Sequence, residues 1–440
     1  MNTFLFTIFL LIAVAFFYIF IKGPYKFSPL FLMLSAWMAA IGISRLSLSQ
    51  LEVAWSSTYV LLIDVSLISF SIGFFVFNWF WKKYPFWTKF KFLNRNAVSI
   101  KNLRIILYVM FVVSVVALFM FYNTAGNFPL LSEDSDVFRF TADEEVPGLI
   151  NYLSQLARIF IPLSFFIMFW PAPTLHGEAG RGGQGFDVRK HWDLVVLCLL
   201  GTLALILFVS RTQIFFVDLW IMALYLFIRK PNLKQALKFF PAFLLISVLV
   251  LAAVPLARQY QSYGSTSYLA GVTEIDTTNF NPVGKLLLPI YVGVSFNQQA
   301  LLHAQQYYEV NPIQHGRVTL DPFTNILGLD QFASEFDLGE IFKPWWNTGT
   351  YLFPFVQDFG TSAFFWIPAL IAGILTMAWR YWVDVKNFLS INLYGYAVFF
   401  IVMTVYLSFT VRAEMYMDLF LLLLIYLFIS WKTDQNFSKI

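Results

Sequence analysis

The 440-residue sequence carries little charge. Only 12% of its residues are Asp, Glu, Lys or Arg, whereas an average soluble domain has about 25%. Hydrophobic residues make up 59% of the chain, and the mean hydropathy is +0.69. This composition excludes an ordinary soluble enzyme, a disordered protein and a small secreted module. Runs of about 20 apolar residues recur along the whole length, which predicts an all-α polytopic membrane protein.

Cysteine and the common cofactor signatures are also scarce. The one cysteine, Cys198, lies in an apolar run, so no internal disulfide and no site built on a Cys pair is possible. The chain has no Walker A pattern, dinucleotide fingerprint or His-Glu-x-x-His motif. Asp134 and Asp136, with Glu133, have a spacing that could bind a divalent cation, but further acidic residues nearby favour a solvated surface. We therefore expect no cofactor, no metal and no nucleic-acid partner.

The apolar runs predict about eleven membrane-spanning helices in one domain covering 1–440. They lie near 3–21, 28–45, 59–81, 105–122, 150–170, 194–209, 213–228, 239–256, 350–377, 388–410 and 413–431. The first run has no basic residue before it and no small-residue cleavage site after it, so we interpret it as a span and not as a signal peptide.

The basic residues predict the orientation of these spans. If the Lys-rich segment 82–104 is cytoplasmic, alternation also places 22–27, 171–193, 229–238, 378–387 and 432–440 inside. These six segments hold 20 of the 29 basic residues and 5 of the 25 acidic residues. The positive-inside rule therefore predicts an N-terminus outside and a C-terminus in the cytoplasm.

The basic residues expected outside are mostly arginine, whereas those inside are mostly lysine. Of the nine outer residues, seven are Arg. A guanidinium group is planar, weakly hydrated and able to grip a phosphate through two bonds. This bias predicts a phosphate-bearing ligand at the outer surface. Ion pairs with outer carboxylates, such as those of Asp64 and Asp218, are the alternative.

The longest predicted connection, 257–349, is expected outside and to carry function, since a structureless loop of this length is uncommon. Within it, Lys285 to Val310 predicts one or two amphipathic or re-entrant helices. The loop is rich in aromatic and amide side chains, which suit the apolar faces and hydroxyls of sugars. An aromatic belt at the lipid headgroups is the alternative.

Three short patterns carry a family resemblance. They are Ser210-Arg211-Thr212, then Arg317 followed after ten residues by Gly328, and Trp346-Asn347-Thr348-Gly349-Thr350-Tyr351-Leu352 continuing to Asp358-Phe359-Gly360. With ten or more spans and one large outer loop, the chain resembles a Wzy-type O-antigen or oligosaccharide repeat-unit polymerase. The resemblance covers roughly 200–360 by motif and the rest by architecture.

The resemblance implies a membrane glycosyltransferase of GT-C-like architecture in the bacterial cytoplasmic membrane. Such an enzyme transfers a glycan from polyprenyl pyrophosphate to a lipid-linked repeat unit at the outer face, in O-antigen, capsule or exopolysaccharide synthesis. A chain-length regulator is a further partner that the family allows. By motif, Arg211 and Arg317 would bind pyrophosphate, and Arg258 and Arg412 join them by position. Trp345, Trp346, Asn347 and Tyr351 are the expected sugar-binding residues.

The general base is less well defined. His315, two residues before Arg317, and Asp358, inside an apolar span, are the catalytic candidates. The related O-antigen ligases have a functional His directly before the Asn of the third motif, where this chain has Trp346. That departure favours a polymerase over a ligase. A lipid-linked oligosaccharide flippase is the other alternative, although no paired halves of the kind found in transporters are visible.

Overall fold

The computed structural model describes residues 2–94, 99–132, 134, 138, 141–142, 145–170, 188–208, 211–231, 233–265, 267–326, 341–343, 346, 348–408 and 410–437. In this part of the chain the regular elements are helices, and an isolated β-bridge joins Ser49 to Ile275. The prediction of an all-α membrane protein is confirmed at this level. The contacts divide the chain into two compact units, which are described separately: unit 1 is 1–94 with 270–422, and unit 2 is 95–269 with 423–440.

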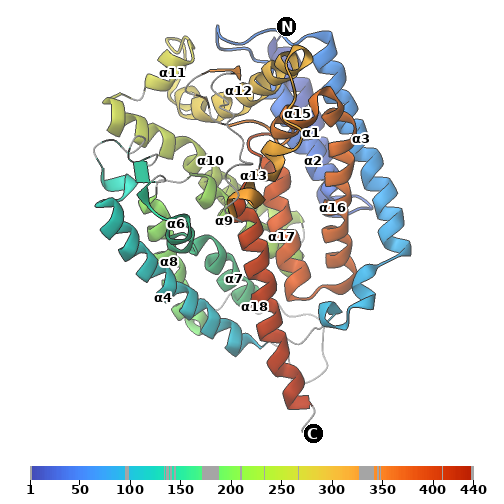
Figure 1. Cartoon of the computed structure of the whole chain (residues 1–440), viewed down its shortest axis with the longest axis vertical. Helices are drawn as coiled ribbons and strands as arrows, with labels where there is room; N and C mark the ends of the chain where they lie inside the picture. Colours follow the sequence, from blue (N-terminus) through green and yellow to red (C-terminus); the bar gives the residue numbers. More distant parts are fainter. Residues whose placement is uncertain are drawn as a thin grey trace. The chain divides into compact units, whose positions relative to one another are not determined.

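Unit 1 is built mainly from apolar helices at the two ends of the sequence. Its helices are α1 (Asn2–Lys22), α2 (Pro29–Ser44), α3 (Ser57–Lys83), α12 (Pro282–Val310), α13 (Arg317–Ile326), α15 (Phe353–Phe359), α16 (Ala363–Val385), α17 (Phe388–Met403) and the first part of α18 (Ala413–Phe437). Unit 2 contains α4 (Ile100–Ala125), α6 (Gly148–Ser154), α7 (Ala157–Phe169), α8 (Trp192–Leu207), α9 (Arg211–Leu224) and α10 (Leu233–Tyr263) (Figure 1). The short helix α11 (Tyr268–Val272) lies where the two units meet in the sequence.

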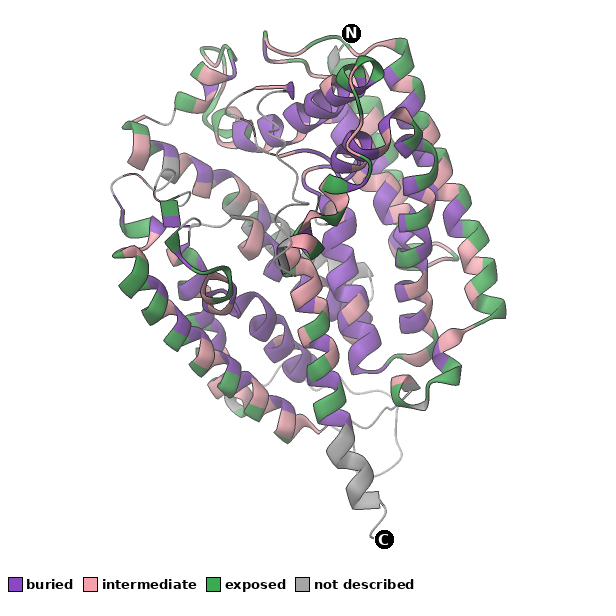
Figure 2. Ribbon diagram, viewed as in Figure 1, coloured by how far each residue is buried: buried purple, intermediate pink, exposed green. Residues whose placement is uncertain are grey.

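Each apolar run expected to span overlaps one or more helices of the structure. Seven helical segments in the described part of the chain are long and apolar enough to cross a membrane, and α2, α8 and α17 are shorter apolar helices. The run 239–256 lies inside the longer α10, and the run 150–170 is divided into α6 and α7 at Gln155 and Leu156. Figure 2 shows exposed residues along one side of α3 and α4, as expected for surfaces that face lipid.

Parallel helix pairs form the core of unit 1. Two close contacts between α3 and α16 join residues with the same separation in the sequence: the Ser69 hydroxyl donates to the Phe365 carbonyl, and Gly73 lies against Ala369. A constant separation means that the two helices run in the same direction. Gly73 permits their close approach, since a Cβ there would come within 2.7 Å of the Ala369 backbone. Likewise α2 and α17 run parallel, with Trp37 Nε1 donating to Thr404 Oγ1 at 3.1 Å.

The direction of α16 bears on whether α12 crosses the membrane. Five apolar segments lie between α3 and α16 in the sequence: α4, α6 with α7, α8, α9 and α10. If each of them crosses the membrane once and α12 does not cross it, α3 and α16 cross in the same direction. A spanning α12 would make them antiparallel. The parallel pair is the arrangement that the expected loop 257–349 requires, and its place on one side of the membrane stays a prediction.

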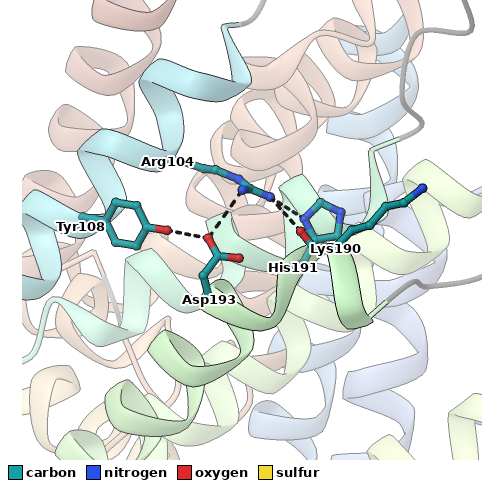
Figure 3. Close-up of polar contacts among 5 residues, drawn as sticks. All are labelled: Arg104, Tyr108, Lys190, His191 and Asp193. Atoms are coloured by element: carbon teal, nitrogen blue, oxygen red, sulfur yellow. Dashed lines mark hydrogen bonds and ion pairs between the residues drawn. The ribbon is translucent and has the colours of Figure 1, made fainter.

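In unit 2, α4 and α8 run side by side in the same direction and are joined at both ends. Near the N-terminal ends of the two helices, Arg104 pairs with Asp193 at 3.5 Å and Tyr108 donates to the same carboxylate at 2.5 Å (Figure 3). At their last turns, Phe121 packs edge-on against Phe208 with ring centroids 5.0 Å apart. α7 lies against both helices, and the α4 side chain of Phe111 meets Phe160.

Candidate functional site

The first turn of α13 rests on a buried carboxylate of α15. Asp358 is fully buried, and its two oxygens accept hydrogen bonds from the backbone N–H groups of Val318 at 3.1 Å and Thr319 at 2.7 Å. The first N–H groups of a helix have no partner within the helix, and a negative charge there is favourable. Asp358 therefore caps α13 from 40 residues away and fixes where this helix begins.

The turn before α13 presents two of the predicted site residues at the surface. Its backbone is tied to α15, because the Gln314 N–H donates to the Gln357 carbonyl at 2.9 Å. His315 and Gly316 then both adopt the left-handed conformation, with φ of 52° and 93°. This conformation is uncommon outside glycine, although His is among the residues enriched in it. The side chains of His315 and Arg317 are both exposed.

Arg412 lies on a segment that contacts the same helix. Phe323 of α13 packs against Tyr416 of α18 with ring centroids 4.6 Å apart, and the Tyr416 hydroxyl donates to the Thr410 carbonyl at 2.8 Å. Arg412 is exposed, and neither its guanidinium nor that of Arg317 pairs with a carboxylate among the described residues. Unit 1 thus carries His315, Asp358, Arg317 and Arg412 on three elements that contact one another in turn: α15 contacts α13, and α13 contacts the start of α18.

The predicted sugar-binding residues have different environments. Trp346 is half-buried and donates from Nε1 to Asn297 Oδ1 at 3.2 Å, which leaves part of its ring accessible. Tyr351 lies in the core of unit 1, edge-on to Trp37 at 5.8 Å and only 1% exposed. A sugar has no access to a ring in that position, so the burial of Tyr351 does not fit a binding role. Trp345 and Asn347 lie outside the described residues.

Several amides of the large loop serve the interior of unit 1. Asn297, Gln298 and Gln299 are buried on α12. Gln299 bonds both the N–H and the carbonyl of Val53 at 3.1 and 3.0 Å, which ties α12 to the connection between α2 and α3. The expectation that the amide side chains of this loop face sugars does not fit the burial of Gln298 and Gln299.

Sequence reasoning missed Glu52, which organises the same connection. Its carboxylate accepts hydrogen bonds from the hydroxyls of Tyr291 and Ser295 on α12 and from the Ser49 N–H at 3.0 Å. Tyr291 and Ser295 are one helical turn apart, so both reach one acidic group. These bonds fix the position of α12, from which the chain enters the turn at His315.

His303 gives unit 1 a pH-sensitive contact. Burial, and then the nearby charge of Lys343, lower the pKa of this half-buried imidazole on α12, whose ring lies 5.1 Å from that of Phe342. At neutral pH the side chain is mostly uncharged in both the folded and the unfolded state. As the pH falls through the ordinary His value of about 6.5, the unfolded state takes up the proton first, so the folded state loses stability.

We expect His303→Gln, which is neutral at every pH, to reduce the loss of thermal stability between pH 7 and pH 5. The measurement is the melting temperature of the purified protein as a function of pH. His315→Gln is the matched control, because His315 is exposed. An unchanged pH profile in His303→Gln would contradict the assignment of this acid sensitivity to His303.

Two further predicted arginines belong to unit 2. Arg211 is the first residue of α9, and Arg258 lies one turn before the last residues of α10. Their side chains are not among those described. The start of α9 lies beside the α6–α7 junction, because Gln213 Nε2 donates to Gln155 Oε1. Close to that junction Arg158 is 5% exposed and stacks over Tyr152 at 4.8 Å, a buried cation that the sequence analysis did not assign to the site.

Comparison with protein-family models, curated proteins and solved structures finds no match to the chain. The acidic segment around Asp134, whose spacing could bind a divalent cation but was expected to be a solvated surface, lies largely outside the described residues. Elsewhere in the described part of the chain, no three His, Cys, Asp or Glu residues are grouped so that they could hold a metal ion.

Proposed function

We propose that this protein is an oligosaccharide repeat-unit polymerase. It would join polyprenyl-pyrophosphate-linked repeat units into O-antigen, capsular or exopolysaccharide at the outer face of the bacterial cytoplasmic membrane. The observation that carries the proposal is the α13 turn, which holds exposed Arg317 on an anchored backbone, at the start of a helix that contacts the segment of Arg412 through Phe323 and Tyr416. The family resemblance of the sequence motifs supports the same assignment.

The chemistry asks for few catalytic groups. A lipid pyrophosphate is already a leaving group, so the protein must stabilise its charge as the bond from the anomeric carbon to the pyrophosphate oxygen breaks. Preorganised guanidinium groups supply this stabilisation without the cost of rearranging water. The acceptor hydroxyl must lie in line with that bond, and its proton must pass to a base.

His315 is the better placed of the two catalytic candidates. Its imidazole is exposed two residues from Arg317, whereas both oxygens of Asp358 already accept backbone hydrogen bonds. We therefore propose His315 as the base and Asp358 as a positioning residue that holds the turn.

We expect His315→Asn to lower the turnover number more than it changes the apparent affinity for the lipid-linked substrate. Asn tolerates the left-handed backbone at this position, so the turn is retained while the imidazole is lost. General-base removal of this kind costs about 10²–10⁴-fold in rate. Steady-state kinetics checks the prediction, and normal turnover in this variant would exclude His315 as the base.

The direct test of the proposal uses purified full-length protein in vesicles with a polyprenyl-pyrophosphate-linked repeat unit. No nucleotide, metal or proton gradient is added, and the glycan is resolved on a gel. A ladder of products supports the polymerase. Movement of the unchanged lipid between leaflets, without a ladder, would replace the polymerase by a flippase, and transfer to a different acceptor in one step would indicate a ligase.

A further inference from the structure

Unit 2 contains an apolar groove between α4, α7 and α8. Its volume is about 310 Å³, and it is lined by aliphatic and aromatic side chains with one hydroxyl, that of Ser114. That hydroxyl already donates to the Ser154 carbonyl at 3.0 Å. The groove therefore offers no free polar partner and suits a hydrocarbon ligand. Its size lies at the lower end of the range for ligand pockets, about 300–1,000 Å³.

The groove opens toward the lipid-facing side of unit 2. Two of its lining residues, Val115 on α4 and Leu203 on α8, are 47% and 59% exposed. Its depth depends on Gly201, because a Cβ there would lie 2.6 Å from the Phe160 ring. The α4–α8 pair is joined near both of its ends, so the space between them is bounded at both ends. A chain entering it would come from the bilayer.

One end of the groove lies beside the segments that carry two of the proposed pyrophosphate-binding arginines. Leu130 lines this end, and its carbonyl accepts a hydrogen bond at 3.1 Å from Gln261, three residues after Arg258 on α10. Leu207 lines the groove four residues before Arg211. The end of the apolar groove at Leu130 and Leu207 therefore lies near the segments of α9 and α10 that carry Arg211 and Arg258.

We infer that this groove binds the polyprenyl chain of the lipid pyrophosphate, next to its headgroup. The inference rests on the proposed function, because that function supplies the lipid. A hydrocarbon chain in the groove would hold the pyrophosphate at the end near Leu130, within reach of the α9 and α10 termini. Among bilayer components, an isoprenoid pyrophosphate has both the apolar chain and the strongly anionic head that this arrangement matches.

The test fills the groove from its exposed wall. Val115→Trp puts a large side chain into the groove, and Val116→Trp is the matched control. Val116 is the next residue, is 53% exposed and does not line the groove. The ladder reaction is run with repeat units on a long polyprenyl chain and on a short prenyl chain. We expect the wild type and Val116→Trp to prefer the long chain by about tenfold or more, since a longer chain buries more methylene groups in the groove.

In Val115→Trp this preference should disappear. If that variant keeps the same preference, the groove assignment is wrong even though the wild type polymerises.

A second readout does not depend on catalysis: a photoreactive polyprenyl pyrophosphate should label peptides of α4 and α8 in the wild type, and excess unlabelled polyprenyl pyrophosphate should compete. Competition by phosphatidylglycerol alone would assign the groove to an ordinary phospholipid and overturn the inference. A wild type that is labelled but forms no ladder would contradict the proposed function and leave the groove assignment intact.

Discussion

Arg317→Lys is expected to abolish polymerisation, with a loss of about 10²–10³-fold in turnover, while the protein inserts into the membrane and melts normally. Lysine keeps the charge but replaces the planar fork by a single ammonium group, which cannot grip a pyrophosphate through two parallel bonds. Removal of one such donor from a preorganised site has a cost of this size in other enzymes. Arg317 is exposed and forms no ion pair among the described residues, so its replacement should not disturb folding.

The measurement for Arg317→Lys is the rate of ladder formation at saturating lipid-linked substrate. Arg380→Lys is the matched control, because Arg380 is paired with Asp384 at 3.2 Å within α16 and has no part in the proposed site. Full polymer length and rate in Arg317→Lys would show that the α13 turn does not bind pyrophosphate.

Asp358→Asn should lower turnover by about tenfold or more by releasing the start of α13. One oxygen remains to accept an N–H, but the amide NH₂ then faces the second backbone donor of Val318 or Thr319. A buried donor left without an acceptor costs about 1–3 kcal/mol, and the favourable charge at the helix N-terminus is also lost. Hydrogen exchange at Val318 and Thr319 should become faster in the variant.

The pH profile separates positioning from catalysis at Asp358. A positioning residue lowers the rate but leaves the shape of the pH–rate curve unchanged, whereas loss of the general base removes a limb of that curve. Asp276→Asn is the control, since this loop carboxylate also accepts a backbone N–H, from Thr278 at 2.9 Å. Loss of the pH limb in Asp358→Asn, with unchanged exchange in α13, would make Asp358 the base and refute its assignment as a cap.

The membrane helices could be predicted from the sequence because their signal is local. A run of apolar residues must be helical in lipid, where every backbone polar group needs an internal partner. The Lys285–Val310 segment was likewise predicted as one or two helices and is the single helix α12. Its boundaries also have local causes, since the Asn281 side chain accepts from the Gly284 N–H and Pro282 stands at the first helical position.

The environments of individual site residues depended on contacts that sequence does not reveal. Asp358 in an apolar run indicated a special role, but its partners lie in Val318 and Thr319, far away in the chain. Tyr351 looked like a sugar-binding aromatic because it belongs to a conspicuous motif, yet the packing of Trp37 from α2 against it makes it a core residue. Gln299 looked available to a ligand until its bonds to Val53 accounted for both of its polar atoms.

The most direct test of the account is the stoichiometry of the polymerase reaction. Purified protein is given a lipid-linked repeat unit labelled in the sugar and in the polyprenyl pyrophosphate, and the two labels are counted in polymer and in released lipid. The account predicts one released polyprenyl pyrophosphate for every new glycosidic bond, with no nucleotide consumed. Bond formation without this release, or release without bond formation, would contradict the central claim that the protein polymerises repeat units with a lipid pyrophosphate as the leaving group.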